Sequence, residues 1–125
     1  MAQMNFNLGP VALTTTYTTN ICNPGTTTGG VASTAAPFDK LYIVLRHVRI
    51  INKTTTAATF RLWIGATGAN AAGTEWMGYD SSVAPNSFVD WYGARRLSQA
   101  DFLVGGAGTA TALTLTAEGE IGVGA

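Results

Sequence analysis

Reactive side chains are few in this chain of 125 residues, which contains one histidine, His47, and one cysteine, Cys22. A zinc site needs several His, Cys or carboxylate ligands at matched spacing, and a single imidazole cannot provide them. A serine or cysteine nucleophile would need His47 as its base, yet Cys22 and the serines lack the Gly-x-Ser-x-Gly turn of a nucleophile elbow. We therefore predict no metal site and no nucleophilic catalysis, with His47 in a structural role and Cys22 as a small buried hydrophobe.

Carboxylate side chains could in principle form a glycosidase pair. Glu118 and Glu120 share one face of a predicted strand, about 7 Å apart by strand geometry. Acidic side chains near a strand end also protect an edge against stray pairing, and we favour that structural interpretation. The glycines of GATGANAAG (65–73) lack the following helix that a phosphate-binding loop needs. The sequence thus predicts a protein that is not an enzyme and that has no cofactor.

Composition excludes further classes of function. Charged residues make up 11% of the chain and the formal net charge is zero, whereas a typical soluble domain carries about 25% charged residues. Nucleic-acid binding would need an excess of lysine and arginine, so we predict none. No stretch is long enough to span a bilayer and MAQMNFNLGP is no secretory signal, so we expect a chain made in the cytosol without processing and without a membrane partner. A nearly neutral surface associates readily, and we therefore expect an oligomer or an assembly component.

Aromatic and arginine side chains offer chemistry for binding. Several tryptophans and tyrosines could form a platform for sugar rings, but these residue types are also enriched in subunit interfaces and cores. We favour the packing interpretation and keep carbohydrate binding as the alternative. Acids on a neighbour would satisfy the guanidinium groups, and Asp90 and Glu118 of an adjacent copy are candidates. The aromatic set is Trp63, Trp76, Tyr79, Trp91 and Tyr92. The predicted interface residues are Arg49, Arg61, Trp63, Trp91, Arg95 and Arg96.

The elements that position these residues have the patterns of strands. VALTTTYTTNIC (11–22) is rich in β-branched residues and predicts a half-buried strand, and NPGTTTGGVASTAAP (23–37) predicts a long surface loop. FDKLYIVLRHVRIIN (38–52) is the strongest strand. Its apolar positions switch from odd to even numbers near Arg46 and His47, which indicates a β-bulge or a change of sheet.

A hairpin is predicted next, because the turn NKTTTA (52–57) leads into ATFRLWIG (58–65). Pairing of residues of like parity places apolar side chains together on the core face. The other register would bury Arg61 without a partner, which is costly. The predicted core pairs come from Val48, Ile50, Phe60 and Leu62, and the predicted outer face collects His47, Arg49, Arg61 and Trp63.

Further strands are predicted at EWMGYD (75–80), FVDWYG (88–93) and ATALTLTAEGEIGVGA (110–125). The last segment alternates apolar and polar residues, as a strand with one solvent-exposed face does. LSQADFLVGG is the helix candidate, because Ser98 and Asp101 resemble a capping box.

Seven or eight short strands separated by glycine and proline turns predict an all-β fold. A β-sandwich or jelly roll of about seven or eight antiparallel strands fits this length best, and a closed barrel is the main rival. We expect an N-terminal arm at residues 1–10 and a single β-sandwich domain at residues 11–125.

The segments VRIINKTTTAATFRLWIGATGANAAGTEW (48–76) and PNSFVDWYGARRLSQADFLVG (85–105) resemble small β-rich virion proteins of tailed bacteriophages, of the head decoration or cement type. The resemblance covers about residues 41–124 and includes no diagnostic site motif. It implies a β-sandwich or jelly roll, commonly a homotrimer, that binds the major capsid protein across neighbouring subunits. The implied location is the capsid surface of the virion, after synthesis in the bacterial host cytoplasm. A tail, fibre or head-fibre component with a carbohydrate- or host-binding role is the alternative.

Overall fold

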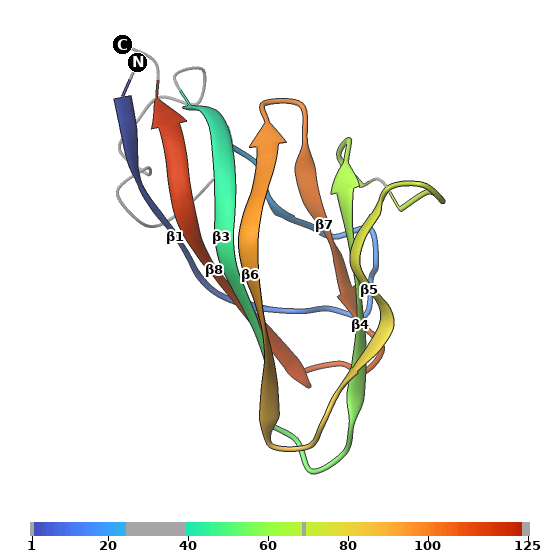
Figure 1. Ribbon diagram of the computed structural model, residues 1–125. Coiled ribbons are helices and arrows are strands. Elements are labelled where there is room, and N and C mark those ends of the chain that lie inside the picture. The colour runs from blue at the N-terminus through green and yellow to red at the C-terminus, as the bar shows by residue number, and fades with distance from the viewer. Residues whose placement is uncertain (1, 25–39, 69, 124–125) are drawn as a thin grey trace.

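The computed structural model describes residues 2–24, 40–68 and 70–123, which form two antiparallel four-stranded sheets (Figure 1). The first sheet has the order β1 (Ala2–Ala12), β8 (Leu113–Val123), β3 (Lys40–Asn52) and β6 (Ser87–Ser98). The second sheet has the order β2 (Asn20–Cys22), β7 (Phe102–Ala107), β4 (Ala58–Gly65) and β5 (Glu75–Val83). The predicted all-β fold is confirmed, and the two separate sheets make it a sandwich.

The strand order follows a single rule. The pairs β1–β8, β2–β7, β3–β6 and β4–β5 are all hydrogen-bonded neighbours, so the chain folds back on itself about the β4–β5 connection. With the exception of β4 and β5, consecutive strands lie in opposite sheets. This is the strand order of an eight-stranded jelly roll.

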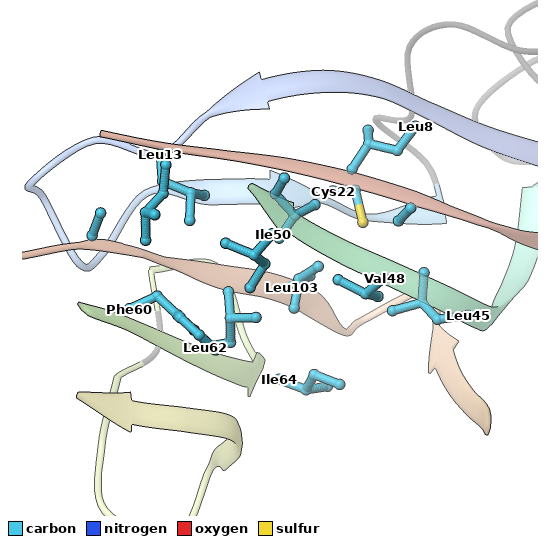
Figure 2. Packing of buried hydrophobic residues seen from close by; sticks show 14 of the residues in the cluster. Leu8, Leu13, Cys22, Leu45, Val48, Ile50, Phe60, Leu62, Ile64 and Leu103 are labelled. Atoms are coloured by element: carbon cyan, nitrogen blue, oxygen red, sulfur yellow. The ribbon is translucent and has the colours of Figure 1, made fainter. Parts of the chain in front are cut away.

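Alternation along each strand fills the space between the two sheets. On β8, Leu113, Leu115 and Ile121 are buried, while Glu118 is exposed on the outer face. Leucine, isoleucine, valine and phenylalanine side chains from both sheets meet in one core cluster (Figure 2). Burial of these side chains is the main favourable contribution to folding.

The face switch predicted in β3 is confirmed. The pairing of β3 with both β6 and β8 shifts between Leu45 and His47, so that Leu45 and Val48 are both buried although their numbers differ in parity. Gly119 lies opposite this β-bulge, and a Cβ atom there would collide with the carbonyl group of Val44. The bulge turns His47 to the outer face of the first sheet.

The predicted hairpin between residues 48 and 65 is wrong, because β3 and β4 belong to different sheets. Their connection crosses from one sheet to the other and is held by the buried side chain of Asn52. Its Nδ2 donates to the carbonyl oxygens of Thr56 at 2.9 Å and Val83 at 3.0 Å, and its Oδ1 accepts from the backbone N–H of Thr54 at 2.9 Å. The predicted core residues Val48, Ile50, Phe60 and Leu62 are all buried, and they face one another across the sandwich.

The expected N-terminal arm is also corrected. Residues 2–12 form β1, which pairs along β8, and Phe6 and Leu8 are buried in the core. The strand predicted at residues 11–22 is divided, because a turn separates β1 from β2. In that turn the Thr19 hydroxyl donates to the carbonyl oxygen of Thr16 at 2.7 Å. The turn forms because threonine hydroxyls compete with the sheet ladder for backbone groups.

The helix predicted at LSQADFLVGG is wrong as well. Ser98 ends β6, and Phe102 begins β7 in the other sheet. The backbone N–H of Ser98 donates to Asp101 Oδ2 at 2.9 Å, and the N–H of Asp101 donates to the Ser98 carbonyl oxygen at 2.9 Å. Ser98 and Asp101, whose spacing resembles a capping box, therefore close a turn between the two sheets. From residue 25 onward, the predicted loop at 23–37 lies outside the described residues.

Each edge strand is short or interrupted. Pairing of β1 with β8 shifts between Leu8 and Val11, and Pro10 lies in that gap. β2 has three residues, and the pairing of β5 with β4 shifts three times. β6 carries the shift opposite the bulge of β3, followed by Arg95 and Arg96. Prolines, bulges and charged residues at these positions limit pairing with further strands.

Candidate functional site

A row of ionisable side chains crosses the outer face of the first sheet where β8, β3 and β6 lie side by side. Arg49 on β3 binds Asp90 on β6 through two hydrogen bonds, Nε–Oδ1 at 2.7 Å and Nη2–Oδ2 at 3.1 Å. His47 Nε2 lies 2.9 Å from Asp90 Oδ1, and His47 Nδ1 lies 3.1 Å from Glu118 Oε1 on β8. The register explains the row, because Arg49 pairs with Asp90 and His47 pairs with Glu118.

The electrostatics of the row depend on Asp90. The hydrogen bond from Arg49, and then the one from His47, lower the pKa of Asp90 from its ordinary value of 3.8 to about 2, while partial burial opposes the shift. The bond to Asp90 in turn raises the pKa of Arg49. Two parallel N–H···O bonds fix the orientation of both groups. These contacts make the row a rigid support for the side chains beside it.

A hollow of about 490 Å³ lies next to this row. It is lined by Asn5 and Asn7 of β1 together with Arg46, His47, Glu118 and Tyr92. Tyr92 stacks on the His47 ring with centroids 4.6 Å apart and planes at 14°, yet it is 70% exposed. A second hollow of about 190 Å³ adjoins the first, since Asn7, His47 and Glu118 line both.

Arg61 occupies the outer face of the other sheet, where it forms a separate cluster. It binds Asp80 through Nε–Oδ1 at 2.7 Å and Nη2–Oδ2 at 2.8 Å. Its guanidinium carbon lies 4.6 Å from the ring centre of Tyr17 and 4.2 Å from that of Tyr79. The hydrogen bond from Arg61 lowers the pKa of Asp80. Arg61 is thus held within the chain by an acid and two aromatic rings.

Trp63 belongs to the Arg61 cluster and is only 2% exposed, although it lies on the outer face of β4. Its ring meets Tyr17 and Tyr79 edge to face, with centroids 6.0 and 6.3 Å apart. Among the described residues its buried Nε1 has no hydrogen-bond partner. The predicted outer-face group is therefore divided, with His47 and Arg49 on one sheet and Arg61 and Trp63 on the other.

The remaining predicted interface residues lie on β6. Trp91 packs edge to face against Trp76 at 5.0 Å, partly buried beside the core. Arg95 and Arg96 are exposed, and no carboxylate within the described ranges pairs with either one. The guanidinium carbon of Arg96 lies 4.2 Å from the ring centre of Tyr42. Of the six predicted interface residues, these two arginines are the most exposed to solvent.

The carboxylates of β8 and the thiol of Cys22 have contacts inside the chain. Glu118 contacts His47, and Glu120 binds Arg46 at 3.1 Å, so each glutamate has its own cationic or imidazole neighbour. Cys22 is buried in the core, which raises the pKa of its thiol to about 12. Over residues 2–24, 40–68 and 70–123, no three His, Cys, Asp or Glu side chains are grouped so as to hold a metal ion.

Sequence reasoning missed several residues of these two clusters. Asn5 and Asn7 fall in the predicted arm but lie on β1, and Tyr17 falls in a predicted strand but lies in a turn. Asp90 pairs with an arginine of its own chain, whereas a neighbouring copy was expected to supply that contact. The alternation of Asn5 and Asn7 with Phe6 and Leu8 is the signal that could have identified β1.

No helix in the described part of the chain is both long enough and apolar enough to cross a membrane. Comparison with protein-family models, with curated proteins and with solved structures finds no match.

Proposed function

We propose that this chain is a non-enzymatic structural protein of a tailed-phage virion, of the head decoration or cement type. In this role it assembles with copies of itself, as a homotrimer, and binds across neighbouring subunits of the major capsid protein. Support comes from the resemblance of residues 41–124, from the jelly-roll strand order and from the low surface charge. Jelly rolls of eight strands occur in viral capsid and lectin domains.

The observation that carries the proposal is a pair of exposed apolar side chains at one end of the first sheet. Ile51 on β3 and Phe88 on β6 lie directly opposite each other in the register. Their exposed fractions are 37% and 52%. Arg49 stacks on the Phe88 ring with its guanidinium carbon 4.4 Å from the ring centre. An apolar pair flanked by a fixed arginine is typical of the centre of a protein interface.

The arginines contribute to this interface in two ways. Arg49 is already neutralised by Asp90, so it presents a flat, oriented surface beside Phe88. Arg61, neutralised by Asp80, lies on the opposite sheet and outside this interface. Arg95 and Arg96 stand exposed on the same edge strand as Phe88. Acids of a capsid protein or of a second copy would complement these two charges, and electrostatic complementarity of this kind favours specific association.

Molar mass in solution tests the self-assembly part of the proposal. Light scattering across micromolar concentrations is expected to give a mass about three times that of the 13.0 kDa chain. Phe88→Ser should lower this mass, because it removes the exposed ring. The matched control is Tyr79→Ser, which removes an exposed ring from the opposite sheet and should leave the mass unchanged.

Co-sedimentation tests the capsid part. The protein is expected to pellet with purified heads of the phage that encodes it, and the Arg95→Glu Arg96→Glu double variant should pellet less. Circular dichroism of each variant verifies that the fold is retained. A strictly monomeric protein that stays in the supernatant would contradict the proposed function.

A further inference from the structure

We propose that the two adjoining hollows on the outer face of the first sheet form a binding site for a neutral, hydroxyl-rich sugar. The site lies over β1, β8 and β3, with Tyr92 of β6 at its rim. It does not depend on the proposed assembly role. In the register, the His47–Tyr92 pair lies four residues from the Ile51–Phe88 pair, about 13 Å along the strand by the rise per residue.

Size is the first argument for a ligand here. The larger hollow measures about 490 Å³, and sites for small ligands have volumes of about 300–1,000 Å³. The smaller hollow of about 190 Å³ shares Asn7, His47 and Glu118 with it. Together they make a continuous depression, which fits a short linear oligosaccharide better than a single compact group.

The lining supplies the mixture of groups that a sugar requires. Hydroxyl groups both donate and accept hydrogen bonds, and the amides of Asn5 and Asn7 can do the same. Arg46 adds further donors, and Glu118, which pairs with Asn7 in the register, adds acceptors. Tyr92 leaves ring surface free for the C–H groups of a sugar ring, as aromatic side chains do when they combine apolar and polar contact.

Charge balance argues that the ligand is neutral. Arg46 faces Glu120, and Arg49 faces Asp90, so each guanidinium is neutralised by a carboxylate of the chain. Glu118 lies against His47. An anionic ligand would be repelled by these carboxylates, and a cationic ligand would be repelled by the arginines. An uncharged ligand is repelled by neither group.

Two side chains of the site, His47 and Tyr92, are held in place before any ligand binds. His47 is held between Asp90 at 2.9 Å and Glu118 at 3.1 Å, and Tyr92 is stacked on it. Rigid side chains lose less conformational entropy when a ligand binds. This preorganisation allows a shallow polar site to bind a sugar with an affinity on the order of millimolar.

A glycan array that carries both bacterial polysaccharide fragments and animal-type glycans tests the inference and distinguishes the two sources. We expect at least one neutral glycan to bind. Titration of the corresponding free oligosaccharide, followed by ¹H–¹⁵N NMR, should shift the amide signals of Asn7 and Tyr92. Tyr92→Ala should weaken binding by about tenfold, the equivalent of one aromatic contact.

Tyr79→Ala is the matched control, because it removes an exposed tyrosine from the other sheet and should bind as the unmodified chain does. Asn7→Ala is a second test on a different strand, and it should also weaken binding if Tyr92→Ala disturbs the fold. Equal binding by the unmodified chain, Tyr92→Ala and Asn7→Ala would overturn the site. An empty array, with no NMR shifts from glucose, galactose or N-acetylglucosamine at tens of millimolar, would also overturn it. Phe88→Ser should bind sugar normally, so loss of assembly and loss of sugar binding are separable.

Discussion

Asp90 and Arg49 form a two-bonded ion pair between neighbouring strands, with Nε–Oδ1 at 2.7 Å and Nη2–Oδ2 at 3.1 Å. The carboxylate side chain is only 17% exposed and also accepts from His47. One acid thus connects β6 to two positions of β3. This connection orders the outer face on which both proposals depend.

Acid should destabilise the fold partly through Asp90. A carboxyl group whose pKa is lower in the folded than in the unfolded chain stabilises the fold when the pH is above its ordinary pKa. This contribution is lost as the pH falls. For Asp90 this contribution is lost as the pH falls from 3.8, its ordinary pKa, through about 2, its pKa in the folded chain. We expect the free energy of unfolding, measured by urea denaturation, to fall across this range. Asp90→Asn should show a weaker dependence on pH there, and an unchanged dependence would contradict this role.

Arg61 should not be replaceable by lysine. The guanidinium binds both oxygens of Asp80 and lies against the rings of Tyr17 and Tyr79. An ammonium group cannot reproduce the planar two-bonded contact. Arg61→Lys is therefore expected to lower the melting temperature measured by calorimetry. Arg95→Lys is the matched control, since no carboxylate in the described ranges pairs with Arg95, and a drop as large for this control would refute the argument.

Gly119 should tolerate no side chain because of the bulge in β3. A Cβ atom at this position would collide with the Val44 carbonyl group and crowd the backbone of Arg46. Gly119→Ala is expected to destabilise the protein by about 1–3 kcal/mol, as overpacking in a tight site does. Gly9→Ala is the control, because nothing lies within 4 Å of a Cβ atom there. Chemical denaturation of both variants measures the difference.

Local features of the fold could be predicted from the sequence. Alternation identified the buried residues of β8 and of the segments around Val48 and Phe60, because side chains of a strand point to opposite faces in turn. The change of parity near Arg46 indicated a bulge or a change of sheet for the same reason, and the structure has the bulge. Parity does not reveal which sheet a strand joins, however. The pattern after Asn52 therefore predicts a hairpin turn, whereas the connection crosses between sheets.

The candidate site was harder to predict, since its members come from different strands. His47 contacts Asp90, 43 positions later, and Glu118, 71 positions later. Only the order β1-β8-β3-β6 brings these residues and Asn7 to one face. The residue types suggested binding, and the strand order determined which of them meet. The six predicted interface residues consequently divide between the two faces and the edge of the sandwich.

The interrupted edge strands have a consequence for the protein at high concentration. A weakly charged, threonine-rich β protein has little electrostatic repulsion to keep its copies apart. Uninterrupted rows of unpaired amide and carbonyl groups would then nucleate ribbon-like fibrils by successive addition of chains. Pro10 in β1, the three-residue length of β2, the irregular pairing of β5 and the two arginines of β6 limit such growth at the edges of the described strands. Association between copies is then left to contacts made through the sheet faces.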